Sequence, residues 1–589
     1  MKKMSIEGTE FLEMTAILGL LDDLAIEKTC PEKGQVFLCG SKEICGKRLH
    51  FNIVFGDNFP NEAPVINLLD AEKKPIIPHV ARHGDVCFME RDVSIIDTSN
   101  PKGVIEESIR RVFSTVERGL KGESKADFFD EIEAYYRDMP GVCCYDSIVN
   151  EIVEPKLLSL ATWKNESVVG VDRQQLTDYF TKTKSSFLTQ SNYSSALHIP
   201  LKRCSAKWIP LPSWSNFWSL SALRAICFKG MEIRHHRYVR WVLRKHKNIP
   251  ILFSLPLANQ TIIHFGVGFY NCKSNSHPLI DTQSKGTPTP ILINRMDKDY
   301  LTARGGASTN LSNKSVAIIG CGAIGSHIAV LLAHSGIMDV ALIDHEFLTK
   351  DNQYRHVLGN DSIGKKKVEG LKLEIERKLP LVNVVAYPFT FEQVQKEKLV
   401  DFSKFDVVVV ATGKVNTNFL INEYFIHHQS GLPLIFTWLD PYGIGGHTLV
   451  SNNKSAAGCY QCLYSKDDSN GIGYHNEACF AKRGQSFTKS IGGCNTRFTP
   501  FSGLDANKAA ENTARIVVGV LQEEIIGNPL YSWKGSAMAF LDAGFKLAPR
   551  FQFSSEELNK QCYDYHKQQC TACGGTGTVH IFPDKRRAA

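Results

Sequence analysis

Apolar residues recur with two different patterns along the chain, and the pattern changes beyond residue 300. In the N-terminal part, helical spacing alternates with the two-residue period of half-buried strands. This predicts helices over 11–26, 105–116 and 127–136, and strands over 35–39, 49–55 and 65–69. Beyond Ser315, near-continuous apolar strands over 339–344, 405–413 and 432–439 accompany helical segments, which is typical of a buried, mostly parallel sheet.

The two patterns predict a multidomain protein of α+β and α/β class. We place an α+β domain at residues 1–145, a linker or accessory domain at 146–294, and a Rossmann-like α/β domain at 295–589. The middle segment is rich in tryptophan, which indicates a packed core, but its sequence shows no catalytic spacing.

The composition is that of a folded protein, with 43% hydrophobic and 22% charged residues among 589. A net charge of +7 is too small for a chain of this length to require a nucleic-acid partner. One segment, 229–248, nevertheless carries seven Lys or Arg and three His among aromatic residues. It is either a solvated surface strand and helix or a docking face for an acidic partner or nucleic acid.

No stretch of the sequence is long and apolar enough to cross a membrane, so we expect a cytoplasmic protein without a membrane partner. In that compartment the seventeen cysteines divide among buried thiols, metal ligands and nucleophiles rather than disulfides.

Three glycines form a phosphate-binding pattern between the first strand of the α/β domain and its helix. Gly320, Gly322 and Gly325 have the GxGxxG spacing that lets backbone amides approach a phosphate at a helix N-terminus. Asp344 ends the next strand, where a carboxylate can bind ribose hydroxyls. These four residues suit NAD as well as ATP, so they leave a dinucleotide-dependent oxidoreductase open.

A polar cluster past the second strand favours ATP. Arg355 and Lys367 suit a triphosphate better than a nicotinamide, and Asn352 lies beside them. The segments IGCGAIGS, IDHEFLTKDNQYRHVLG and GKKK resemble the adenylation domain of ubiquitin-activating enzymes and their bacterial relatives ThiF and MoeB. The resemblance covers about residues 295–575. It implies that Asp344 holds the ribose, Arg355 and Lys367 the phosphates, and Asn352 the reacting group.

One departure from that family concerns magnesium. The family usually has Thr-Asp-Asn after the strand at 405–413, and its Asp helps to hold Mg²⁺, whereas this chain has Thr412, Gly413 and Lys414. We expect Mg²⁺ together with ATP and name Asp440, which ends the next strand, as the replacement ligand. A helix or turn cap is the alternative role for Asp440.

Two CxxC pairs predict a metal site. Cys459 with Cys462 and Cys570 with Cys573 supply the four thiolates that tetrahedral structural Zn²⁺ needs. Relatives of ThiF and MoeB have the same arrangement, in which the metal would staple the C-terminal tail to the sheet domain.

Cys494 lies in a glycine-rich loop before a helix, where amides and the helix dipole lower the pKa of a thiol. Activating enzymes that form a thioester carry their cysteine here, which implies that Cys494 accepts the activated acyl group. Cys479 is the other candidate.

The N-terminal domain contains a second candidate nucleophile. The segments LHFNIVFGDNFPNEAPVINLL and IPHVARHGDVCFMERD resemble the core of a ubiquitin-conjugating enzyme over roughly residues 10–140, and Cys87 falls at the active-cysteine position. Conjugating enzymes usually carry His-Pro-Asn, whose Asn supports the oxyanion, whereas this chain has Pro-His-Val around His79. A backbone amide or His83 would then stabilise the charge, and His79 is either a loop-locking residue or a catalyst.

The combination resembles the fused activating and conjugating enzymes of bacterial CBASS anti-phage operons, the CD-NTase-associated protein 2 family. The resemblance implies an ATP-dependent ligase that adenylates the C-terminal glycine of a partner cGAS/DncV-like nucleotidyltransferase (CD-NTase). The glycine would pass from Cys494 to Cys87 as a thioester and then to a target amine, priming antiviral cyclic-nucleotide signalling. A homodimer through the adenylation domain is also implied. The alternative is a sulfur-carrier-activating adenylyltransferase of ThiF/MoeB type with a non-catalytic N-terminal binding module.

Overall fold

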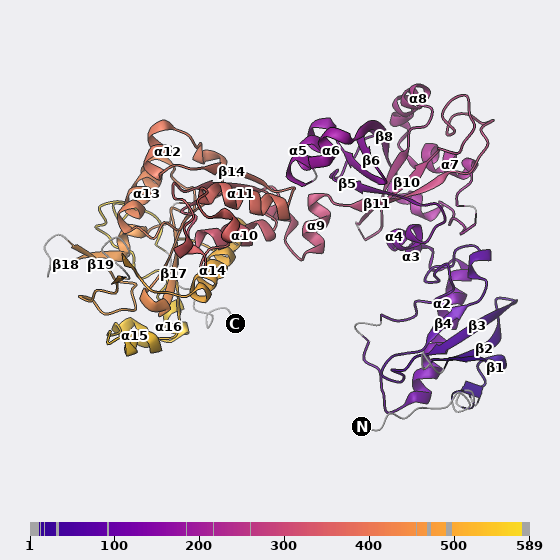
Figure 1. Cartoon of the computed structure of the whole chain (residues 1–589), viewed down its shortest axis with the longest axis horizontal. Coiled ribbons are helices and arrows are strands. Elements are labelled where there is room, and N and C mark those ends of the chain that lie inside the picture. The colour runs from indigo at the N-terminus through magenta and orange to yellow at the C-terminus, as the bar shows by residue number, and fades with distance from the viewer. Residues whose placement is uncertain are drawn as a thin grey trace. The chain divides into compact units, whose positions relative to one another are not determined.

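A computed structural model describes residues 11, 13, 15–16, 18–30, 35–90, 94–183, 185–215, 217–259, 261–454, 456–467, 473–490 and 497–579. The chain divides into two compact units (Figure 1). The first comprises the residues up to Asp178 together with Ser186–Met296, and the second comprises Tyr179–Ser185 and the residues from Asp297 onward. Within the described residues, no helix combines the length and apolar character that a membrane span requires.

The N-terminal part of the first unit is an antiparallel sheet of order β1-β2-β3-β4 that packs on a long helix. The elements are β1 (Asp22–Cys30), β2 (Gln35–Ile44), β3 (Lys47–Phe55), β4 (Val65–Leu68) and α2 (Pro101–Lys121). Alternate residues of β3, among them Phe51 and Ile53, are buried in one core with Ile105 and Ile109 of α2. The predicted strands and the helix predicted over 105–116 are therefore present.

The helix predicted over 11–26 is wrong in its second half. Described residues between Phe11 and Ala16 are helical, but the chain turns at Gly19, where φ is +61°. The strand β1 then begins at Asp22. Leu24 lies four residues after Leu20, as on one face of a helix, but also two residues before Ile26, as on one face of a strand, so the apolar pattern fits either element. The helix predicted over 127–136 is also interrupted, at Glu131, into α3 (Lys125–Asp130) and α4 (Ile132–Arg137).

The segment after α4 forms a closed barrel of order β10-β11-β5-β7-β6-β8-β9, an architecture that the sequence did not predict. Its strands are β5 (Cys143–Ser147), β6 (Lys156–Trp163), β7 (Glu166–Gly170), β8 (Asn192–Pro200), β9 (Ile251–Pro256), β10 (Ile262–Gly268) and β11 (Thr289–Arg295). The helices of this region are α5 (Arg173–Thr183), α6 (Ser185–Gln190), α7 (Leu220–Gly230) and α8 (His236–Lys245). Phe129 and Tyr136 of α3 and α4 share a core with Trp218 and Phe265. The helices α3 and α4 therefore pack on the barrel.

The second unit contains a sheet of order β14-β13-β12-β15-β16-β17-β22. The strands are β12 (Ser315–Ile319), β13 (Asp339–Ile343), β14 (Asn383–Tyr387), β15 (Val407–Val410), β16 (Leu434–Leu439), β17 (Gly445–Ser451) and β22 (Leu530–Lys534). Pairing is parallel from β14 to β16, while β17 and β22 add antiparallel strands. The buried, mostly parallel sheet of the prediction is confirmed, and with it the multidomain fold class.

Helices cover both faces of this sheet. One face packs on α10 (Gly325–His334), α11 (Lys367–Lys378) and α14 (Gly503–Leu521), and the other on α12 (Phe391–Glu397) and α13 (Val415–His428). The remaining elements are α9 (Lys298–Arg304), α15 (Met538–Asp542), α16 (Ser555–Lys560), β18 (Tyr464–Asp467), β19 (Gly473–Asn476), β20 (Lys489–Ser490) and β21 (Arg497–Phe498).

The strand order reverses between β12 and β15, and such switch points hold ligands in open α/β sheets.

Candidate functional site

The glycine loop joins β12 to α10, and each of its three glycines meets a different steric demand. At Gly320, φ is +92°, and an added Cβ would lie 2.7 Å from the backbone of Ala411. At Gly325, a Cβ would lie 1.9 Å from the carbonyl oxygen of Gly320. At Gly322, nothing lies within 4 Å. The outer two glycines therefore close the turn, while the middle one leaves the backbone open to a ligand.

A pocket of about 270 Å³ opens beside this loop, at the carboxyl ends of β12, β13 and β15. Its lining includes Gly320, Gly322 and Asp344, so the structure brings these three predicted residues together. One carboxylate oxygen of Asp344 accepts a hydrogen bond from the Cys321 amide at 2.7 Å, and the other accepts from the Glu346 amide at 2.8 Å. Backbone donors thus fix the acid at the pocket rim, where ribose hydroxyls would be recognised.

Two lysines flank an acid at the same pocket. The ammonium of Lys367 lies 2.7 Å from one carboxylate oxygen of Glu346, and that of Lys414 lies 3.3 Å from the other. Burial opposes ionisation of Glu346, but the ion pairs with these lysines prevail and lower its pKa to about 2. Glu346 and Lys414 line the pocket, whereas Lys367 is buried behind them. The cluster supplies positive charge next to the glycine loop.

In the N-terminal domain, Cys87 lies exposed in the loop that follows β4. Its amide donates a hydrogen bond to the carbonyl oxygen of His79 at 2.8 Å. The loop is tight at Gly84, where φ is +97° and a Cβ would lie 2.2 Å from the Leu68 carbonyl oxygen. The thiol is therefore exposed at the surface, while the hydrogen bond to His79 and the tight turn at Gly84 fix the backbone that carries it.

His79 is held from three sides. Its backbone amide donates to the Tyr135 hydroxyl at 2.6 Å, and its ring nitrogens lie 3.1 Å from Asp127 and 3.4 Å from Glu131. The hydrogen bond with Glu131 is the main cause that raises the pKa of His79 to about 9, against the opposing effect of burial. The side chain is thus an imidazolium at neutral pH. Of the two roles considered for His79, this geometry favours the loop-locking residue.

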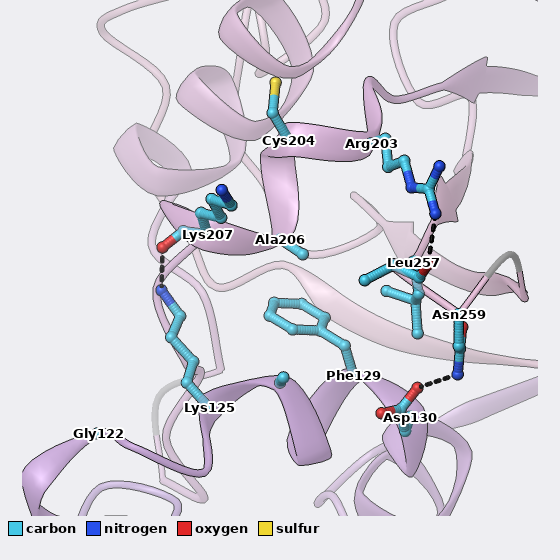
Figure 2. A pocket seen from close by; sticks show the side chains of 12 residues that line it. Gly122, Lys125, Phe129, Asp130, Arg203, Cys204, Ala206, Lys207, Leu257 and Asn259 are labelled. Atoms are coloured by element: carbon cyan, nitrogen blue, oxygen red, sulfur yellow. Dashed lines mark hydrogen bonds between the residues drawn. The ribbon is translucent and has the colours of Figure 1, made fainter.

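Figure 2 shows how α3, which carries Asp127, is fixed to the barrel. The Lys125 ammonium donates to the carbonyl oxygen of Lys207 at 3.0 Å, and the Asn259 amide donates to Asp130 at 3.2 Å. Between these contacts, Phe129 points into a pocket of about 820 Å³. The barrel therefore supports the helix that in turn holds the loop of Cys87.

The four predicted metal ligands converge. The ligand atoms of Cys459, Cys462, Cys570 and Cys573 all lie within 4.8 Å of one another. Three of the Sγ–Sγ distances are 3.7 to 3.9 Å. Four sulfurs at these separations form the tetrahedral thiolate set that binds structural zinc. The Asn422 amide donates to the sulfur of Cys459 at 3.5 Å, which orients this ligand.

Comparisons with known proteins agree with this geometry. Residues 299–528 match the model of the ThiF family, and residues 25–141 match that of the prokaryotic E2 family B. The chain is 23% identical over 423 residues to the ATP-dependent ubiquitin transferase-like protein Cap2 of Pseudomonas aeruginosa, which covers 68% of this chain and 73% of that protein. It is 21% identical over 518 residues to the protein of the same name from Escherichia coli, which covers 79% and 83%. The chain is thus similar to two Cap2 proteins over most of its length.

The ThiF match and the E2 match in one chain, together with the similarity to the Cap2 proteins, support a ubiquitin-like conjugating enzyme of the combined activating (E1) and conjugating (E2) type. The predicted resemblance and enzyme class are therefore confirmed. Among solved structures, the crystal structure of E. coli MccB with succinimide has 24% identity and a TM-score of 0.30, and the match spans 38% of this chain and 62% of that chain.

Besides Gly325 and Lys367, two further predicted ATP ligands, Asn352 and Arg355, are not among the residues that line the pocket. The amide oxygen of Asn352 accepts from the backbone and the hydroxyl of Thr349, both at 3.1 Å, and so caps a short helical turn. The guanidinium of Arg355 lies 4.6 Å from the ring centroid of Phe501. Their roles toward ATP stay predictions. Glu346 was not among the predicted site residues, and Lys414 was named only as a departure from the family, although a lysine four residues after β15 signals a cation beside the glycine loop.

The structure does not support Asp440 as a magnesium ligand. Asp440 is buried, and one of its oxygens accepts from the Phe480 amide at 2.7 Å and lies 3.2 Å from Nε2 of His447. It does not line the nucleotide pocket, and its side chain makes no cap hydrogen bond to the turn that follows it. Through these hydrogen bonds Asp440 instead connects the end of β16 to β17 and to the segment that follows β19.

Cys494 lies outside the described residues, so its role stays a prediction. Cys479 is described and half-buried. Burial and the neighbouring carboxylate of Asp440 raise the pKa of the Cys479 thiol well above its usual value. A thiol in this setting is a poor nucleophile, which weighs in favour of Cys494.

Proposed function

We propose that this enzyme ligates the C-terminal glycine of a partner CD-NTase, a cGAS/DncV-like nucleotidyltransferase, to a target amine. The observation that carries the proposal is the presence, in one chain, of a nucleotide pocket and of an exposed cysteine at the position where conjugating enzymes hold their acyl group. Transfer to an amine would prime the partner for antiviral signalling, as the CBASS family resemblance implies.

Three group transfers would follow a single use of ATP. The glycine carboxylate attacks the α-phosphate and releases pyrophosphate. The thiolate of Cys494 then attacks the acyl adenylate and releases AMP. Cys87 takes the acyl group by thioester exchange, which restores the Cys494 thiol. Finally the amine attacks the Cys87 thioester, an amide bond forms, and the Cys87 thiolate leaves.

ATP fits the residues that line the pocket. Asp344 would accept from ribose hydroxyls, and the amides around Gly322 would approach phosphate, because no side chain fills that space. Lys414, and Lys367 behind it, would offset phosphate charge. The pocket volume of about 270 Å³ lies just below the ~300–1,000 Å³ range of ligand pockets, so it accommodates part of the nucleotide and leaves the rest toward solvent.

Two metals complete the proposal. Mg²⁺ would accompany ATP and neutralise phosphate charge, and among the carboxylates that line the pocket, Asp344 and Glu392 form no ion pair with a lysine of the described residues. Zn²⁺ would be held by the four clustered cysteines and would tie the C-terminal segment to the sheet domain. We also propose a homodimer formed through the adenylation domain, which light scattering of the purified chain would test.

The relay is tested by purifying the Cys87→Ser variant with ATP and its partner nucleotidyltransferase. We expect an oxyester between the partner's C-terminal glycine and Ser at position 87, identified by mass spectrometry. The Cys494→Ala variant should retain ATP–pyrophosphate exchange but give no such adduct. Conjugation that persists in a Cys87→Ala variant would remove Cys87 from the mechanism. The N-terminal domain would then be a binding module, as in the sulfur-carrier alternative.

A further inference from the structure

The segment that contains helix α8 carries a local excess of positive charge. Residues 229–248 carry seven Lys or Arg and one Glu, a net charge of +6 in a chain whose total is +7. The segment contains no strand: a short 3-10 turn, Ile233–His235, leads directly into α8. Val239 and Leu243 are buried on the inner side of the helix, so its charged residues face outward.

The exposed cations of this turn and of α8 have no acidic partners among the described residues. They are Arg234, Arg237, Arg240, Arg244 and Lys245, and none forms an ion pair with a carboxylate of the described residues. Helix α2 provides a contrast within the same unit. There Arg110 lies 2.9 Å from Glu106, Arg111 lies 2.7 Å from Glu107, and Lys121 pairs with Glu117 at 2.7 Å. Like charges one turn apart destabilise a helix, so α8 retains repulsion that α2 avoids.

Apolar and aromatic side chains lie exposed among these cations. The rings of Tyr238 and Trp241 stack with centroids 6.1 Å apart, and 51% of Trp241 is accessible to solvent. The Lys245 ammonium lies 4.0 Å from the Trp241 ring centroid. Ile233, in the turn before the helix, is 80% exposed. Trp, Tyr and Arg are the side chains that most often dominate protein–protein binding energy, and apolar residues bordered by charge are typical of an interface.

We propose that this surface docks an acidic surface of a partner protein. We call it the α8 face, and it comprises Ile233, Arg234, Arg237, Tyr238, Arg240, Trp241, Arg244 and Lys245. An acidic partner would relieve the repulsion among the arginines, and its apolar atoms would cover Ile233 and Trp241. Single-stranded nucleic acid is the less suitable occupant, because it binds in charged grooves lined by stacking platforms. The α8 face is the outer side of a helix, and an exposed isoleucine gains nothing from phosphate. The inference does not depend on the proposed thioester relay.

Photo-cross-linking of the full chain in its own host cells tests the α8 face. The probe is p-benzoylphenylalanine placed at Tyr238. We expect a protein adduct whose cross-linked peptide is rich in Asp and Glu. Neutralising the α8 face with Arg237→Gln, Arg240→Gln and Arg244→Gln should reduce that adduct at least fivefold. The matched control on α2 is Arg110→Gln, Arg111→Gln and Lys121→Gln, and it should leave the adduct within twofold.

Three results would overturn the proposal. One is an adduct that nuclease digestion removes, which would assign the surface to nucleic acid. Another is the absence of any adduct. The third is a protein adduct that persists when the α8 cations are neutralised. The thermal unfolding midpoint of each variant checks folding, and because all the substituted residues are exposed, we expect it to be unchanged.

Discussion

The nucleotide pocket and the Cys87 loop differ in how far along the chain their supports lie. The pocket is built where β12, β13 and β15 end side by side, and its acid, Asp344, closely follows the glycine loop in sequence. The Cys87 loop is held by Asp127, Glu131 and Tyr135, about forty to fifty residues downstream, on helices that pack against the barrel.

This difference explains why motifs describe one site better than the other. A parallel sheet places the carboxyl ends of its strands at one edge, so the residues that directly follow neighbouring strands lie close together. The support of Cys87 depends instead on contacts between separate layers of the first unit, which no short motif encodes. Four experiments would test this difference, and we give them in order of expected effect.

The largest effect is expected for Gly325→Ala. A Cβ at this position would lie 1.9 Å from the Gly320 carbonyl oxygen, so either the glycine loop or the start of α10 would have to move. We expect ATP–pyrophosphate exchange to fall at least a hundredfold. Gly359→Ala is the control, because nothing lies within 4 Å of its added Cβ. Exchange that survives in Gly325→Ala would show that the nucleotide site does not depend on this turn.

Removal of a metal ligand should have the next largest effect. In Cys570→Ser the site keeps three thiolates, so we expect zinc content to fall and the second unit to lose stability on the order of 3 kcal/mol. Elemental analysis and the thermal midpoint measure both. The control is Cys204→Ser, an exposed cysteine outside the cluster. Full zinc content in Cys570→Ser would contradict the assignment of the ligands.

A smaller effect, confined to the conjugating half, is expected for His79→Gln. The substitution removes the imidazolium that pairs with Asp127 and Glu131, so the loop of Cys87 should loosen. We expect conjugate formation to fall roughly tenfold, equivalent to about 1.4 kcal/mol, while ATP–pyrophosphate exchange is unchanged. His50→Gln, an exposed histidine on β3, is the control. An equal loss of exchange would mean that the two halves are not separable in this way.

The smallest effect is a pH dependence of the same loop. Because the pKa of His79 is raised to about 9 from a usual 6.5, the clamp stabilises the fold fully below pH 6.5 and weakens as pH rises through 9. Hydrogen exchange of the Cys87 amide, corrected for its intrinsic rate, should therefore lose protection a few fold between pH 7 and 9.5. The groups that face His79 are Asp127, Glu131 and Tyr135, with Arg118 3.9 Å from Asp127. A profile that is the same in His79→Gln would assign the change to another group.

Several features could be predicted because they depend on neighbouring residues. The GxGxxG spacing, the acid after the next strand and the two CxxC pairs each specify local backbone geometry, and the structure places them as their spacing indicates. Asn352 and Arg355 were assigned from their place past the second strand and given their roles by the family resemblance, but their side chains contact Thr349 and Phe501 instead of lining the pocket. The break of the first helix was missed because Leu24 has the helical spacing from Leu20 as well as the strand spacing to Ile26.

The sequence by itself determined the order of domains, the parallel sheet with its glycine loop, the four metal cysteines and the position of Cys87. Hydrophobic period and ligand spacing encode these features within short segments. Only the tertiary structure decided the closed barrel, the clamp on His79, the pairing of Glu346 with two lysines and the cations of α8, which form no ion pair within the described part of the chain. Each of these arises from residues far apart in sequence or from the absence of a partner, and a linear pattern records neither.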